Sequence, residues 1–347
     1  MKFFLFLVLL LTGCGQAAQA PLSKQAANYL QATDALDLSQ ARLENPLGVT
    51  DATAFEIAYG AHQRQKFDFI RPNVSGVVPL VIYVHGGGFV RGDKSSFFSR
   101  SSRAEMARGY LADGFAIASV NYRFLHQTGD GVRASMQDVM RALQFMRFHA
   151  DSLGVDRDKV LCHGQSAGAG TCLWLALRDD MAAPTSADPI AAQSTKVSGA
   201  VATATQSTYD VLRWKDEIFA SYLDYPIIRS IPLGWYPGAE RLLSFYGITT
   251  EDQLYTPDIL AYRRDVDLLQ HFDAEDPPLL ISNSLPDEAP TSPNMMFHSP
   301  LHALALLEMA KGVGTDYAVV AKELGITERS HSGMPVTPVN FARFLLQ

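Results

Sequence analysis

Short, nearly continuous apolar runs recur along this chain and alternate with stretches of helical periodicity. An apolar run without polar alternation is typical of a strand that is buried on both faces. Strands that alternate with helices favour an α/β fold, in which a mostly parallel sheet is covered by helices on both faces. The runs lie at 79–84, 115–121, 160–162, 197–203 and 279–282, and alternating patterns at 55–59 and 66–70 add two strands. The predicted helices lie at 98–111, 132–150, 167–177, 301–311 and 339–346.

The first residues are typical of an export signal. Met1 and Lys2 give a positive start, and the apolar run 3–11 is too short to span a bilayer as a helix. The run ends in Leu-Thr-Gly before Cys14, which resembles the lipobox of bacterial lipoproteins. The resemblance implies cleavage before Cys14, acylation of that cysteine, and an exported protein anchored by lipid to a bacterial membrane, facing the periplasm or the exterior. An ordinary secretory signal with an incidental cysteine is the alternative.

Three regions are therefore expected: a signal peptide at 1–13, a spacer at 14–49 and one main domain at 50–347. A hydrophobic content of 47% supplies material for a large core. The net charge of -7, without a run of lysine or arginine, argues against nucleic acid as a partner. Cys162 and Cys172 are expected to pack as small apolar residues, with a disulfide as the alternative. The oligomeric state is left open.

One glycine-rich stretch carries a candidate nucleophile. Gly164, Ser166 and Gly168 form the pattern G-x-S-x-G between an apolar strand and a small-residue helix, where serine hydrolases place their nucleophile. The serine sits on a sharp turn, and side chains at the two glycines would collide with the neighbouring strand and helix. His163 lies three residues before Ser166 and has the side chain needed to accept its proton.

A second glycine run follows the strand 79–84. His85 is followed by three glycines and Phe89, the pattern of an oxyanion loop. The backbone N–H groups of Gly86 and Gly87, together with that of Ala167, are predicted to hold the oxyanion of a tetrahedral intermediate. His85 is expected to organise this loop by a hydrogen bond.

Together these motifs resemble the carboxylesterases and lipases of the α/β-hydrolase fold, close to the hormone-sensitive-lipase-like and feruloyl-esterase-like groups. The resemblance runs from about residue 59 to the end and includes the segments 85–93, 120–123 and 164–168, with Asp138 and Ala142 before the serine. In this fold the catalytic residues follow the order serine, acid, histidine. His163 precedes the serine, so it is expected to be a packed residue beside its strand.

The resemblance also implies where the acid and the base lie. The stretch 277–282 resembles the strand before the family's acid, which places that acid at Asp287, with Glu288 in reserve. His331, in a polar loop before the last helix, takes the place of the family's catalytic histidine. His298 and His302 are four residues apart and could suit a metal, but without a third ligand they are expected to be helix-surface residues. No metal and no cofactor are predicted.

A segment at about 207–270 interrupts the strand–helix alternation and is predicted to form a cap. It is rich in aromatic residues, most of which are expected to form the cap's own core, while a few line an apolar pocket above Ser166. This favours hydrophobic or aromatic esters. The residues are Tyr209, Trp214, Phe219, Tyr222, Tyr225, Trp235, Tyr236, Phe245 and Tyr246.

The sequence therefore predicts a serine esterase that cleaves small-molecule carboxylic esters through an acyl-enzyme, with Ser166, His331 and Asp287 as its triad. An amidase or peptidase, or an esterase of carbohydrate esters, would use the same residues. A catalytically silent binding lipoprotein on the same fold is the alternative from another class.

Overall fold

The computed structural model describes residue 36 and residues 46–49, 52–231 and 238–347. The predicted signal peptide, the lipidation of Cys14 and two cap aromatics, Trp235 and Tyr236, lie outside the described residues. The lipid anchor therefore stays a prediction. Within the described part, no helix is both long enough and apolar enough to cross a membrane.

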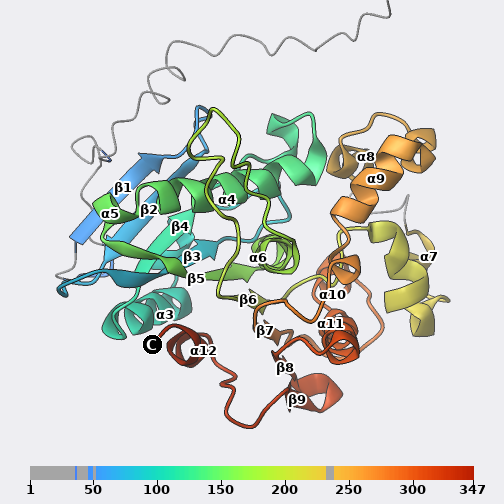
Figure 1. The fold of residues 1–347 in the computed structure, drawn as a ribbon. Helices are drawn as coiled ribbons and strands as arrows, with labels where there is room; N and C mark the ends of the chain where they lie inside the picture. Colours follow the sequence, from blue (N-terminus) through green and yellow to red (C-terminus); the bar gives the residue numbers. More distant parts are fainter. Residues whose placement is uncertain (1–35, 37–45, 50–51, 232–237) are drawn as a thin grey trace, which may run out of the picture.

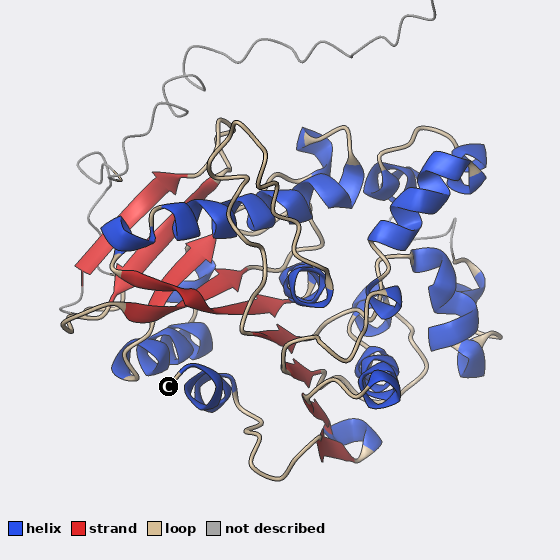
Figure 2. Cartoon of the chain, viewed as in Figure 1, coloured by secondary structure: helices blue, strands red, loops and turns tan. Residues whose placement is uncertain are grey.

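A nine-stranded sheet forms the centre of the molecule, with the strand order β1-β2-β4-β3-β5-β6-β7-β8-β9 (Figures 1 and 2). The strands from β4 through β8 are parallel, and β1, β2 and β9 run antiparallel to their neighbours. The apolar runs become the parallel centre, as predicted. The bounds are β1 Ala52–Ala58, β2 Lys66–Arg71, β3 Val78–Val84, β4 Ala116–Val120, β5 Val155–Gln165, β6 Gly199–Thr203, β7 Leu279–Ser282, β8 Tyr317–Ala321 and β9 Ile326–Arg329.

Helices cover both faces of this sheet. On one face, α3 (Ser101–Ala112) and α12 (Pro338–Leu346) pack on strand residues such as Val81. On the other face, α4 (Gly131–Phe148), α6 (Ala167–Leu177) and α11 (Pro300–Val313) pack on strand residues such as Ile82. Figure 1 shows α3 and α12 below the sheet and α4 above it. Successive side chains of a strand point to opposite faces, so each central strand must be apolar throughout. The shorter helices are α2 Ser96–Ser99, α5 Ala150–Leu153, α7 Pro226–Arg229, α8 Ala239–Tyr246, α9 Pro257–Asp265 and α10 Pro293–Phe297.

The segment between β6 and β7 holds α7, α8 and α9 beside the carboxyl ends of the strands (yellow and orange in Figure 1). Its aromatic residues are largely buried, including Tyr209, Trp214, Phe219 and Tyr246, as expected for the core of a cap. Two ion pairs tie its parts together: Arg213 with Asp267, and Arg263 with Asp210 at 2.9 Å.

The sequence did not predict β8 and β9. β9 turns back against β8, so the N–H of Ser330 donates to the carbonyl oxygen of Tyr317, the first residue of β8, at 2.9 Å. Residues after β9 therefore lie near the amino end of β8, away from the strand ends that follow β5 and β7.

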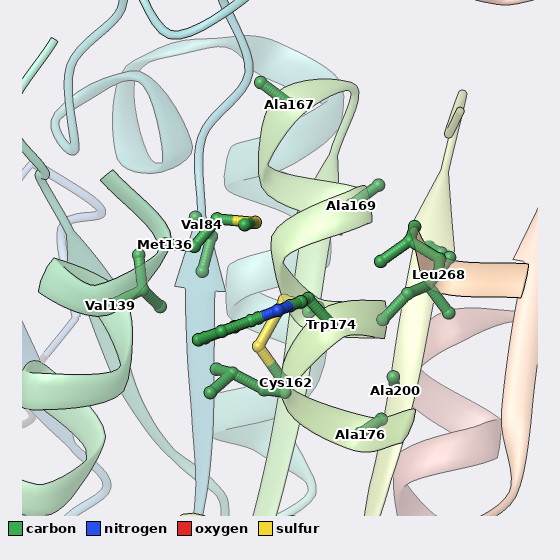
Figure 3. Close-up of a cluster of buried hydrophobic side chains, with 14 of the residues drawn as sticks. Val84, Met136, Val139, Cys162, Ala167, Ala169, Trp174, Ala176, Ala200 and Leu268 are labelled. Atoms are coloured by element: carbon green, nitrogen blue, oxygen red, sulfur yellow. A yellow bond between two sulfur atoms is a disulfide. The ribbon is translucent and has the colours of Figure 1, made fainter. Parts of the chain in front are cut away.

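Cys162 and Cys172 form a disulfide, so the prediction that they pack as separate small residues was wrong. Cys162 is on β5 and Cys172 is on α6, and their Cα atoms are 5.3 Å apart. The sharp turn at Ser166 folds α6 directly over its own strand, which brings two residues ten apart within bonding reach. Figure 3 shows the disulfide in the apolar core below Ala167, beside Trp174.

Candidate active site

Ser166 stands at the turn between β5 and α6. Its backbone angles are φ 52° and ψ −120°, a conformation that residues other than glycine rarely adopt. A Cβ atom at Gly164 would lie 2.1 Å from the carbonyl oxygen of Gly168. A Cβ atom at Gly168 would lie 2.1 Å from the carbonyl oxygen of Val84 on β3. Both glycines are thus required by contact with backbone, as the sequence predicted, and the turn holds Ser166 above the sheet.

His298 is the histidine that meets the serine. Its Nε2 atom lies 2.8 Å from Ser166 Oγ, and its Nδ1 atom lies 3.0 Å from Asn294 Oδ1. Because an amide oxygen only accepts, Nδ1 carries the proton and Nε2 is left to accept from the serine hydroxyl. Burial lowers the pKa of His298 below the usual value of an imidazole, so the ring is neutral at pH 7. Ser166, His298 and Asn294 thus form a serine–histidine–amide relay.

Three buried side chains hold the backbone that carries His298, which joins α10 to α11. His302 Nε2 donates to the carbonyl oxygen of Met296 at 3.1 Å, and Gln206 Nε2 donates to that of Phe297 at 2.7 Å. Asn283 Nδ2, just past β7, donates to the carbonyl oxygen of Ser299 at 2.9 Å. The imidazole of His298 is therefore placed by the cap, by β7 and by α11 together.

His302 is not on the helix surface, so that prediction was wrong. It is fully buried, and its Nδ1 atom lies 2.9 Å from Ser207 Oγ. Burial lowers its pKa to about 3. Both of its nitrogens have protein partners, so it supports the loop instead of binding a metal. Within the described residues, no cluster of three or more His, Cys, Asp or Glu side chains is arranged to hold a metal ion.

The structure does not bring His331 to Ser166, so its prediction as the base is corrected. His331 is exposed, and its ring lies 5.6 Å from that of Phe344 on α12. The reason is the turn back along β9, which carries the chain to the amino end of β8 before His331. A histidine in a loop that followed β8 directly would instead lie at the carboxyl ends of the parallel strands, where Ser166 also lies.

The two predicted acids are not joined to a histidine either. Asp287 and Glu288 are exposed in the loop after β7. Asp287 faces Tyr222 of the cap, whose pKa is raised by desolvation and by the charge of Asp287. No hydrogen bond within the described part of the chain links Asp287 or Glu288 to His298 or His331. Asn294 takes the position next to the imidazole that the prediction gave to Asp287.

His298 is one of three histidines that follow the predicted acid in the sequence. The place of His331 before the last helix favours His331 over His298 when only the sequence is considered. The available signal was the spacing of Asn294 and His298, four residues apart. That spacing puts the amide and the imidazole on one side of a helical turn. Because an asparagine is not the expected third residue of a catalytic triad, this spacing alone does not indicate a catalytic pair.

The expectations for His163 and His85 are confirmed. His163 is buried on the α3 face of the sheet, with Nδ1 3.0 Å from the hydroxyl of Tyr110. Burial lowers its pKa to about 3. His85 is buried below the glycine loop, with Nδ1 2.7 Å from the carbonyl oxygen of Gly86, and its ring stacks on Tyr122. Both rings therefore organise their surroundings and neither meets the serine.

The glycine loop lies directly against the serine turn. A Cβ atom at Gly86 would be 3.0 Å from Ser166 Cβ and 2.8 Å from the carbonyl oxygen of Gln165. Gly87 has φ 121°, and a Cβ atom there would lie 1.9 Å from the carbonyl oxygen of Arg91. Only glycine permits this path, which keeps the backbone of residues 86 and 87 beside the nucleophile.

Two cavities meet at Ser166. One is an open cleft of about 1210 Å³, with His298 and the glycine loop in its wall. The other is a small, mostly apolar pocket of about 40 Å³ under the cap. The sequence predicted an apolar pocket above the serine, and the aromatic residues in its lining are Phe89, Tyr209, Trp214, Phe245 and Phe297.

Comparison with solved structures places this architecture among known folds. A truncated carbohydrate esterase from gut microbiota matches 78% of this chain and 87% of its own, with a TM-score of 0.56 and 13% identity. An esterase B from Lactobacillus rhamnosis matches 82% of this chain and 78% of its own, with a TM-score of 0.54 and 18% identity. The chain has an α/β-hydrolase fold.

Comparisons with known sequences match a part of this chain. The BD-FAE family model matches residues 67–217, which include the glycine loop and Ser166. Gut esterase 1 of Caenorhabditis elegans is 24% identical over 127 residues, 35% of this chain and 22% of the relative. The segments matched in the curated relatives span between 21% and 25% of their lengths. The family model thus spans the serine turn and the glycine loop, and each of these relatives is matched over only a part of its length.

Proposed function

We propose that this protein is a carboxylic ester hydrolase that works through an acyl-enzyme on Ser166. The observation that carries the proposal is the 2.8 Å contact between Ser166 Oγ and His298 Nε2, at the strained turn where two cavities meet. A serine hydroxyl is a weak nucleophile unless a base takes its proton as it attacks. The esterases similar to this chain in sequence and in fold support the same class of reaction.

The first half-reaction forms the acyl-enzyme. Ser166 Oγ attacks the ester carbonyl while its proton passes to His298 Nε2, and the Nδ1–H of the resulting imidazolium donates to Asn294 Oδ1. The backbone N–H groups of Gly86, Gly87 and Ala167 hold the oxyanion. The carbon–oxygen bond to the alcohol then breaks, and His298 returns the proton to the leaving oxygen.

The second half-reaction releases the acid. Water loses a proton to His298 and attacks the acyl carbonyl, and the proton returns to Ser166 as the acid leaves. The carbonyl oxygen again lies in the oxyanion site. Each cycle consumes one ester and one water, and the residues named need no cofactor for these steps.

The small pocket sets the acyl group in this proposal. Its volume of about 40 Å³ is small, so it suits a short acyl chain better than a long one. The aromatic walls exclude water and favour an apolar chain. The proposal therefore narrows the preference expected from sequence, from aromatic and hydrophobic esters in general to esters with a short acyl group.

The test compares hydrolysis of p-nitrophenyl acetate by the wild type, Ser166→Ala, His298→Gln and His331→Gln. We expect the first two variants to lose about 10³-fold or more in kcat. His331→Gln serves as the matched control and should keep wild-type activity. If His331→Gln is inactive and His298→Gln is not, the assignment of the base is overturned.

A fluorophosphonate probe separates catalysis from silent binding. We expect the wild type to be labelled at Ser166 and the Ser166→Ala variant to stay unlabelled. A wild-type protein that neither reacts with the probe nor cleaves the ester would contradict the proposed function and support the binding lipoprotein. Faster cleavage of the matched anilide than of the ester would point to an amidase.

A further inference from the structure

The open cleft in front of Ser166 is rich in arginine. Arg91, Arg100, Arg103 and Arg241 line it, with Asp93 as the one lining carboxylate within the described residues. This composition contrasts with the net charge of -7 of the whole chain. A cleft lined by one sign of charge concentrates ligands of the opposite sign.

Within the described residues, Asp93 forms no ion pair with Arg91, Arg100 or Arg103. Its Oδ2 atom accepts from Asn121 Nδ2 at 2.7 Å, and its Oδ1 atom accepts from the N–H of Ser95 at 2.9 Å. These bonds lower its pKa and direct its oxygens toward the turn that begins α2. Within residues 52–231 and 238–347, no carboxylate lies within 4.0 Å of the guanidinium of Arg91, Arg100 or Arg103.

Two of the arginines stand at the amino end of α3. Arg100 is the N-cap residue of this twelve-residue helix, makes no capping hydrogen bond, and is followed by a first turn without an acidic residue. Arg103 lies in that first turn. The amino end of a helix already carries partial positive charge, so cations there are unfavourable and anions are favourable. This helix therefore presents two guanidinium groups where its own dipole disfavours them, and both line the cleft.

Arg103 is tied to the nucleophile's neighbour. Its guanidinium donates to Oε1 of Gln165, the residue before Ser166, and to Ser96 Oγ at 3.3 Å. These two bonds hold the guanidinium of Arg103 near the serine. A planar guanidinium has five N–H donors, so donors remain for a ligand in the cleft.

We propose that this cleft binds the alcohol part of an ester that carries an oxyanion group, such as a carboxylate, a sulfate or a phosphate. The inference rests on the proposed esterase function and deepens it. The small apolar pocket that also reaches Ser166 takes the short acyl chain, so the wide cationic cleft takes the alcohol. Arg100 and Arg103 bind the anion and orient the leaving oxygen toward His298. The proposed substrates are esters of a short acyl group with an alcohol that carries such an anionic group, for example a sugar with a carboxylate.

The test uses matched leaving groups. Initial rates are measured with para-acetoxybenzoate and with its neutral amide, para-acetoxybenzamide, and the ratio of the two kcat/KM values is compared between proteins. Taking the ratio between proteins removes the difference in intrinsic reactivity of the two esters. We expect Arg100→Gln/Arg103→Gln to lower this ratio about tenfold, because charge-assisted hydrogen bonds to the anion are lost. Added salt should lower the wild-type ratio as well.

Arg157→Gln is the matched control, since Arg157 is a half-exposed arginine that pairs with Asp151 outside the cleft. It should leave the ratio unchanged. Replacing the carboxylate by a sulfonate distinguishes a general oxyanion site from one shaped for carboxylate. If the double variant keeps the wild-type ratio while both esters are cleaved, the anion site is overturned and the esterase stands. If the wild type cleaves neither ester, the proposed function itself fails.

Discussion

Asn294 accepts the hydrogen bond from the Nδ1–H of His298, where a carboxylate is the expected partner. A neutral amide oxygen fixes the tautomer and the orientation of the ring, but it gives the imidazolium only a dipole to interact with. With burial also lowering the pKa of His298, the ring loses its proton readily and acts as a base at mildly acidic pH. Burial of the ring and its neutral partner together are expected to set the pH range of the proposed reaction.

This predicts the pH dependence of kcat/KM. The rate should rise with pH as His298 loses its proton, with a midpoint below 6.5 because burial lowers the pKa of the ring. Asn294→Asp places a negative charge beside the imidazolium and should raise the midpoint by about one unit or more. The measurement is a pH–rate profile of the wild type, Asn294→Asp and Asp287→Asn. A midpoint that moves in Asp287→Asn and stays in Asn294→Asp would return the acid role to Asp287.

At the scale of elements, α3 shows a conflict between stability and the proposed binding site. Its N-cap position is occupied by Arg100, which makes no capping bond, although serine, threonine, aspartate or asparagine is preferred there. The preceding residue Ser99 belongs to α2, so the chain passes from one helix to the next through Arg100 in an extended conformation. A serine at this position could cap the first turn of α3.

Arg100→Ser should therefore stabilise the protein while weakening its preference for anionic esters. The hydroxyl can accept from an N–H of the first turn, and loss of the cation removes repulsion from the helix dipole. We expect the free energy of unfolding to rise by about 0.5–1 kcal/mol. Thermal and urea unfolding of the two proteins would check this. A lower stability of the variant would show that Arg100 makes a favourable contact. It would contradict the claim that Arg100 lowers the stability of the protein.

At the scale of the whole molecule, burial strongly lowers the pKa of three of the buried histidines, His85, His163 and His302. Burial lowers the pKa of His163 and His302 to about 3 and that of His85 to about 4. Each ring carries hydrogen bonds that join separate elements, for example His163 on β5 to Tyr110 on α3. In the unfolded chain these rings have the ordinary pKa near 6.5.

The protein should therefore lose stability as the pH falls below about 6.5. The unfolded state then binds protons that the folded state excludes, and the loss continues until the pH reaches the folded pKa values. At pH 5.5 each ring removes about 1.4 kcal/mol from the free energy of unfolding. Urea unfolding of the wild type and His163→Leu at pH 7.5 and 5.5 should show a pH effect about 1.4 kcal/mol smaller in the variant. The exposed His331→Gln should keep the wild-type pH effect, and equal effects in all three proteins would contradict the prediction.

The central strands, the serine turn and the glycine loop of the site can be predicted from local sequence. The apolar runs predict the parallel strands, and the glycines at 86, 87, 164 and 168 predict the loop and the elbow, since each is required by a contact with nearby backbone. His163 could be rejected as the base from the residue order that the α/β-hydrolase resemblance implies. The disulfide could not be predicted, because it depends on how closely α6 folds back over β5.

The sequence by itself determined the central strands of the sheet, the serine turn and the glycine loop beside it, because these depend on hydrophobic patterning and on sharp turns that only glycine permits. Only the tertiary structure decided which histidine meets Ser166, which residue partners that histidine, and the charge of the cleft. His298 and His331 both follow the serine in the chain, and the difference between them is which edge of the sheet their loop reaches. That edge is set by the antiparallel return of β9, which pairs Ser330 with Tyr317 at the start of β8. Long-range strand pairing of this kind leaves little local signal, so the choice between the two histidines required the folded chain.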